Sequence, residues 1–141
     1  MKKLLFLLFA ACSIAPAFTH AQAPAQQETK VDAPRFKFVE GDVFDFGKVE
    51  QGPDVFHEFE FVNTGTQPLV IVDAKPSCSC TTPEWPKEPI PPGGKGKIKV
   101  GFHATKAGLF NKEVYIQSNA YIPTGEKRYT IYIKGEVKNK D

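Results

Sequence analysis

The sequence predicts an all-β protein: a single immunoglobulin-like antiparallel β-sandwich of about seven strands. Short segments with apolar side chains at every second position recur through residues 35–138, and turns containing Gly or Pro separate them. Beyond the N-terminal leader, no segment shows the 3.6-residue apolar period of an amphipathic helix. We therefore expect one domain over residues 35–138, followed by a solvated tail at residues 139–141.

The expected strands cover residues 36–39, 43–49, 55–63, 69–73, 95–103, 110–117 and 127–137. Alternation in the third of these places His57, Phe59 and Phe61 on the core side and Glu58 and Glu60 on the opposite side. Residues 69–73 form a continuous apolar run, which predicts a strand covered on both faces.

The N-terminus has the pattern of a secretory signal peptide. Lys2 and Lys3 precede an apolar run at residues 4–11, which is too short to span a bilayer, and small residues follow. We expect cleavage after Ala21, and hence a secreted or periplasmic protein with no membrane span. The alternative is lipoprotein processing, because Cys12 ends a lipobox-like segment and is a candidate lipidation site.

Residues 22–34 are rich in Ala, Gln and Pro and predict a flexible tether. The whole chain has 18 Lys and Arg against 16 Asp and Glu, so removal of Lys2 and Lys3 with the leader leaves 16 against 16. A mature domain with a formal charge near zero has no basic surface for nucleic acid or anionic lipid. We therefore expect no nucleic-acid partner.

Cys78 and Cys80 are the only cysteines of the expected mature protein. Three interpretations remain open: a small local disulfide or two inert thiols, a soft-metal site in which both thiolates bind Cu(I), and a site of thiol–disulfide exchange. A four-ligand zinc site would need more donors. His57 shares the parity of core residues whereas His103 does not, so we do not expect the two histidines to converge on one metal.

The cysteines lie in residues 76–94, which predict a rigid loop with Trp85 at its centre. Prolines restrict the conformers of such a segment, and those of this candidate partner-binding loop are Pro83, Pro86, Pro89 and Pro91. One interpretation makes Trp85 a pre-organised anchor for a protein partner. The other makes the segment a cap over an open end of the sandwich.

No enzymatic motif is present in the chain. Gly-x-Ser-x-Gly and His-Glu-x-x-His are both absent. Glu58 and Glu60 are paired carboxylates, but their parity places them on a solvated strand face that implies no cleft. We therefore expect a protein that is not an enzyme.

Several segments together resemble a bacterial secreted family known only as domain of unknown function 1573. They are Phe46-Gly-Lys-Val49, His57-Glu-Phe-Glu-Phe61, Asn63-Thr-Gly65, Pro68-Leu-Val-Ile71, Ser77-Cys-Ser-Cys-Thr81, Pro89-Ile-Pro-Pro-Gly93, Gly108 with Phe110 and Lys112, Ser118-Asn119 and Gly135-Glu-Val137. More distantly, the pattern resembles the abnormal-spindle, hydin and major-sperm-protein class of immunoglobulin-like domains. The resemblance implies a fold and export, and it carries no activity. The family usually has Cys-Gly-Cys, where this chain has Ser79; serine is the costlier residue if the turn needs a positive φ.

Two functional hypotheses follow from the sequence. The first is an exported, non-enzymatic binding or scaffold module of the bacterial cell envelope, which contacts an unknown protein partner through the Pro-rich loop or an exposed strand edge. The alternative is a copper-handling or thiol-redox protein that acts through Cys78 and Cys80.

Overall fold

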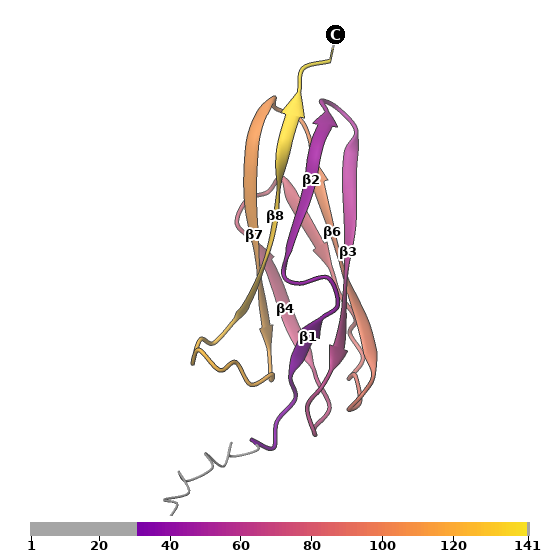
Figure 1. The fold of residues 1–141 in the computed structure, drawn as a ribbon, viewed down its shortest axis with the longest axis vertical. Helices are drawn as coiled ribbons and strands as arrows, with labels where there is room; N and C mark the ends of the chain where they lie inside the picture. Colours follow the sequence, from indigo (N-terminus) through magenta and orange to yellow (C-terminus); the bar gives the residue numbers. More distant parts are fainter. Residues whose placement is uncertain (1–30, 141) are drawn as a thin grey trace, which may run out of the picture.

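A computed structural model describes residues 31–140 of the protein (Figure 1). The expected signal peptide, the candidate lipidation site at Cys12 and most of the expected tether lie outside the described residues. The described part contains no α-helix, and none of its segments could therefore cross a bilayer as a helix.

Eight strands form two four-stranded sheets that pack as a sandwich, as predicted. The strands are β1 (Phe36–Phe38), β2 (Val43–Glu50), β3 (Asp54–Asn63), β4 (Ile71–Pro76), β5 (Thr81–Glu84), β6 (Lys95–His103), β7 (Gly108–Ser118) and β8 (Tyr129–Lys138). One sheet has the order β1-β3-β6-β5 and the other β2-β8-β7-β4.

The core lies between the two sheets and is built by the alternation seen in the sequence. Phe59 and Phe61 of β3 point inward, while Glu58 and Glu60 point to solvent. Large, fully buried aliphatic side chains come from both sheets, and they are Leu69, Ile98, Val100, Val114, Ile116, Ile131, Ile133 and Val137. Burying large apolar side chains from both layers is the main favourable contribution to such a fold.

One strand pairing differs from the expected antiparallel arrangement. β2 runs parallel to β8, whereas the other pairs are antiparallel. The N-terminal strand is divided: β1 pairs with β3, and after a turn at Gly41, whose φ is +89°, the chain crosses to the other sheet as β2. Because the chain keeps its direction as it passes from β1 to β2, β2 lies parallel to β8 in the second sheet. The local sequence does not encode the direction of that neighbour.

The prediction of a strand covered on both faces at residues 69–73 is wrong. β4 begins at Ile71 and lies at the edge of its sheet, and the side chain of Val72 is 64% exposed. The register with β7 shifts between Ile71 and Asp73, which marks a β-bulge. Leu69 lies outside β4. It forms an isolated β-bridge with Ile90, and its side chain is buried.

The expected loop at residues 76–94 contains a strand that the sequence analysis missed. Thr81–Glu84 forms β5, which pairs with β6 from Phe102 back to Lys99. Pro83 is compatible with this strand because β5 is at a sheet edge, where a missing backbone N–H can face away from the ladder.

The molecule is elongated, with residue 31 at one end and the C-terminus at the other (Figure 1). Gly108 at the start of β7 pairs with Val137 near the end of β8, so the turn between β6 and β7 lies toward the C-terminal end. We call this the distal end, because it is opposite the point at which the chain enters the domain.

Candidate functional site

Cys78 and Cys80 form a disulfide where the chain passes from one sheet to the other. β4 ends at Pro76, and β5 begins in the second sheet at Thr81. The chain turns between the cysteines so that their Cα atoms are 5.3 Å apart, within the usual range for a bridge. The bridge therefore closes a ring within the crossover segment itself, with Ser79 at its exposed tip.

Backbone hydrogen bonds hold both sides of this crossover. The Ser77 amide donates to the Glu113 carbonyl at 2.8 Å, and the Glu113 amide donates to Ser77 Oγ at 3.0 Å. On the other side the His103 amide donates to the Cys80 carbonyl at 2.9 Å. The crossover is thus tied to β7 of one sheet and β6 of the other.

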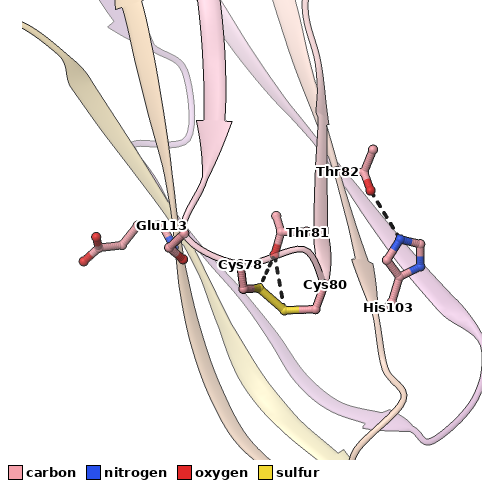
Figure 2. The surroundings of a disulfide bond; sticks show 7 residues. Cys78, Cys80, Thr81, Thr82, His103 and Glu113 are labelled. Atoms are coloured by element: carbon pink, nitrogen blue, oxygen red, sulfur yellow. Dashed lines mark hydrogen bonds between the residues drawn. A yellow bond between two sulfur atoms is a disulfide. The ribbon is translucent and has the colours of Figure 1, made fainter.

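Thr81 brings a buried hydroxyl to the bridge. The residue is only 3% exposed, and Figure 2 shows its hydroxyl directed at the two sulfur atoms. Thr81 Oγ1 lies 3.5 Å from Cys78 Sγ and 3.9 Å from Cys80 Sγ. Since bridged sulfurs carry no hydrogen, the hydroxyl is the donor, and its shorter contact is to Cys78.

A pocket of about 350 Å³ opens beside the bridge at the distal end. Cys80 lines it, together with His103, Lys106 and Lys112 and the apolar side chains of Phe102 and Leu109. Cys78 is not among the lining residues, and neither is any Asp or Glu. The pocket therefore gives access to one cysteine of the pair from a cationic side.

The structure offers no complete metal site within residues 31–140, since no group of three or more His, Cys, Asp and Glu side chains is close enough to hold an ion. A Cu(I) site at Cys78 and Cys80 would require reduction first, because bridged sulfurs are not thiolates. The copper alternative thus concerns the reduced form of the protein.

The two histidines lie on opposite faces of their sheet. The His57 ring stacks on Phe44, with 3.5 Å between ring centroids, on the core side. Burial lowers the pKa of His57 below its usual value of 6.5, and the carboxylates of Glu40 and Glu58 partly oppose this effect. His57 is therefore a packing residue, and its burial favours the neutral imidazole.

His103 belongs to an exposed hydrogen-bonded line across three strands. Its Nδ1 is 2.8 Å from Asp54 Oδ1, and its Nε2 is 3.2 Å from Thr82 Oγ1 (Figure 2 shows the second contact). The order of groups is that of a hydroxyl–imidazole–carboxylate triad. The line crosses the solvated face of a sheet, and His103 and Asp54 are each 41% exposed. We interpret it as a clamp that holds the edge strand β5 to β6 and β3.

The predicted partner-binding loop is packed more closely than an open anchor would be. Trp85 packs against the hydrophobic core, and its Nε1 is buried without a hydrogen-bond acceptor. Lys87 Nζ lies 3.2 Å from the centroid of the indole ring and covers its outer face. Pro89 and Pro91 remain exposed. This geometry favours the interpretation of Trp85 as a cap.

An exposed apolar site that the sequence analysis did not identify lies on the outer face of β2, β8 and β7. Leu109 is 88% exposed there and borders a pocket of about 590 Å³. Gly47 and Gly135 line the pocket, and a Cβ at Gly135 would lie 2.8 Å from the Gly47 carbonyl oxygen and from the Phe110 ring. Alternation could have revealed Leu109. Phe110 has core parity, so the side chain of Leu109, the residue before it in the strand, must point outward.

The rim of this pocket carries charges of both signs. Lys48 and Lys134 come from β2 and β8, and Asp45 and Glu136 come from the same two strands. Lys134 Nζ lies 3.7 Å from an Asp45 carboxylate oxygen. An apolar side chain surrounded by mixed charges is typical of the anchor region of a protein interface.

The free strand edges are poor templates for an added strand. β1 has three residues, β5 has four and contains Pro83, and β4 has the bulge at Val72. The register of β2 shifts between Asp45 and Lys48, where Gly47 has a φ of +65°. Short strands, bulges and prolines are the devices that prevent edge-to-edge pairing.

The fold is that of an immunoglobulin-like β-sandwich and is similar to that of PapD-like domains. The structure superimposes on the PapD-like domain 7 of human CEP192 with a TM-score of 0.58 and 14% identity, over 91% of this chain and 100% of that domain. A protein of unknown function from Porphyromonas gingivalis W83 gives a TM-score of 0.62 with 16% identity, over 80% of this chain and 51% of that one.

The particular family follows from the sequence match. The family model described as protein of unknown function (DUF1573) matches residues 36–137, and the chain belongs to this family. The VesB protease of Vibrio cholerae also contains a similar fold, with a TM-score of 0.58 and 15% identity over 74% of this chain. This chain spans about half of the Porphyromonas protein and 32% of VesB, so these likenesses concern the fold alone. No curated protein matches the chain.

Proposed function

We propose that the protein is an exported, non-enzymatic binding module of the bacterial cell envelope, and that it binds a protein partner through the outer face of β2, β8 and β7. The observation that carries the proposal is Leu109, which is 88% exposed beside a pocket of about 590 Å³. When a partner covers a large apolar side chain on a sheet face, the free energy of the system falls by about 25 cal/mol for each Å² of apolar surface removed from water.

The chemistry of the partner follows from the pocket and its rim. The pocket accepts an apolar side chain, and Lys48, Lys134, Asp45 and Glu136 would pair with charges of either sign around it. We therefore expect a partner segment in which an apolar residue is flanked by both acidic and basic residues. The position of the pocket toward the distal end supports this role, because the opposite end carries the N-terminal segment that would lead to an anchor or a tether.

Photo-crosslinking in the producing bacterium tests this proposal. A photoreactive amino acid at position 109 should give a discrete cross-linked product, and the same amino acid at position 72 should not. Val72 is a matched control because it is 64% exposed on the same sheet but lies beside the far end of β7, where β4 pairs with Gln117 and Ser118. Equal products from both positions, or none from position 109, would contradict the proposed surface; a product of twice the mass of the chain would identify a second copy as the occupant instead.

Export is tested separately on the full-length chain. Mass spectrometry of the protein from the periplasmic or secreted fraction should show a polypeptide that begins at Gln22, after cleavage behind Ala21. A diacylglyceryl mass on Cys12 would establish the lipoprotein alternative. Recovery of the uncleaved chain from the cytoplasm alone would refute the proposed localisation.

A further inference from the structure

The surroundings of the Cys78–Cys80 bridge differ from those of an inert staple. One cysteine, Cys80, lines a pocket, and the hydroxyl of Thr81 is held against the other sulfur atom. We propose that this disulfide is a site of thiol–disulfide exchange with small anionic thiols, meaning thiols that carry a carboxylate or a sulfonate. This function is additional to partner binding at Leu109 and does not depend on it.

The direction of attack follows from access. The attacking thiolate must reach one sulfur atom of the bridge; both cysteines are half-buried, and of the two only Cys80 lines the pocket that holds Lys106 and Lys112. The thiolate therefore forms a new S–S bond with Cys80 Sγ while the Cys78–Cys80 bond breaks, and Cys78 leaves as a thiolate. A second molecule of the thiol then attacks the mixed disulfide. The products are the oxidised thiol dimer and the reduced Cys78–Cys80 pair, so two electrons pass from two thiols to the protein.

Thr81 is placed to assist the leaving group. Its Oγ1 is closer to Cys78 Sγ than to Cys80 Sγ, at 3.5 Å against 3.9 Å, and the residue is 3% exposed. A hydrogen bond from a hydroxyl to a developing thiolate stabilises the charge, and a better leaving group accelerates exchange. The hydroxyl is directed at the sulfur atoms before reaction, as Figure 2 shows.

The choice of an anionic thiol follows from the charges around the pocket. Lys106 and Lys112 line it, and no carboxylate does. The carboxylate of Asp54 is bound to His103 on the sheet face. The Glu113 side chain lies beside the crossover but points away from the bridge (Figure 2). The sulfonate or carboxylate group of an attacking thiolate is thus attracted to the pocket, and an ammonium group in the same place is repelled.

The bridge can open without disrupting the strands on either side. The ring contains only three residues, and closing so short a loop removes little conformational entropy from the unfolded chain, so the bridge contributes little to stability. β5 retains its pairing with β6, and Ser77 retains its two hydrogen bonds with Glu113. The oxidised and reduced forms therefore share one fold, which is what a reversible exchange site needs.

The first experiment compares three thiols of similar size on the native protein. Beside the thiol, 2-mercaptoethanesulfonate carries an anionic sulfonate, 2-mercaptoethanol a neutral hydroxyl, and cysteamine a cationic ammonium group. Opening of the bridge is followed by alkylation and mass spectrometry, and each rate is divided by the thiolate concentration. Because solvent screens the charges of Lys106 and Lys112 only in part, we expect the sulfonate to open the bridge about tenfold faster than cysteamine at low salt. Equal rates for the three thiols would overturn the proposal.

Substitutions then separate the roles of the lining residues. Lys106→Gln with Lys112→Gln should remove the preference for the sulfonate. Lys37→Gln with Lys127→Gln removes the same charge away from the pocket and should preserve that preference. The proposal is refuted if both pairs behave alike.

The role of Thr81 and the site of attack have their own tests. Thr81→Val should slow opening by every thiol, and Thr81→Ser, which keeps the hydroxyl, should retain the native rate. Rapid quenching with N-ethylmaleimide should place the incoming thiol on Cys80 and the maleimide on Cys78. The opposite labelling would show that the pocket does not direct the attack, and equal rates for the two Thr81 variants would remove the hydroxyl from the mechanism.

Discussion

Asn63→Ala should be among the most destabilising single substitutions in the protein. Asn63 is fully buried, and its side chain makes four hydrogen bonds: Oδ1 accepts from the amides of Arg35 and Gly65, and Nδ2 donates to the carbonyls of Gln67 and Ile90. These bonds tie the segment before β1, the turn after β3 and the segment before β6 to one side chain. Four bonds at about 1 kcal/mol net each give about 4 kcal/mol, and the buried groups left unsatisfied add to this, so we expect a loss of at least about 4 kcal/mol.

Asn119→Ala is the matched control for this prediction. The Asn119 side chain also bonds the backbone from both ends, since Oδ1 accepts from the Val70 amide at 2.8 Å and Nδ2 donates to the Pro68 carbonyl at 3.0 Å. Asn119 is exposed, so water replaces both partners, and the expected loss is about 1 kcal/mol. Urea unfolding followed by tryptophan fluorescence measures both. Similar losses for the two variants would refute the argument that burial makes the Asn63 bonds costly to remove.

Three further predictions concern packing, pH and the bridge. Gly96→Ala would place a Cβ 2.5 Å from the Phe61 ring, so thermal unfolding should show a loss of about 1–3 kcal/mol; an unchanged midpoint would contradict that packing. Because burial lowers the pKa of His57, the unfolded state binds its proton more readily and stability should fall as the pH drops from about 7 to 5. His57→Phe should flatten this part of the urea-midpoint curve, and an unaltered slope would assign it to other groups. Replacing Cys78 and Cys80 together by Ala should cost no more than about 1.6 kcal/mol in urea, and a larger loss would show that the bridge is needed for the fold.

The all-β class and most of the strands could be predicted because alternation is a local property. In β3, β6 and β7 the side chains of core parity are buried and their neighbours face solvent, as the apolar pattern indicates. The errors occurred where local composition resembled another structure. Residues 69–73 have the composition of a central strand, yet Val72 lies at a bulge in an edge strand and is exposed. Pro83 made residues 81–84 look like a loop, although they form the edge strand β5.

The candidate sites were less accessible to sequence reasoning. The segment that contains Cys78 and Cys80 was identified, but the Thr81 hydroxyl and the pocket beside Cys80 depend on residues from β6, β7 and the turn between them. Leu109 lies just outside the strand predicted at residues 110–117 and was not identified from the sequence. Its neighbours in the pocket come from β2 and β8, which are distant in the chain. Trp85 was singled out as an anchor or a cap, and the contact with Lys87 together with its packing on the core favours the cap.

The sequence by itself determined the family, the two-layer β architecture and the segment that carries both cysteines. Side-chain periodicity and motif spacing are local properties that can be read directly from the sequence. Only the tertiary structure decided that β2 runs parallel to β8, that Cys80 and not Cys78 borders a pocket, and that Leu109 stands exposed above one. These features arise where strands from different parts of the chain meet. Each depends on long-range register, and no local pattern of residues specifies that register.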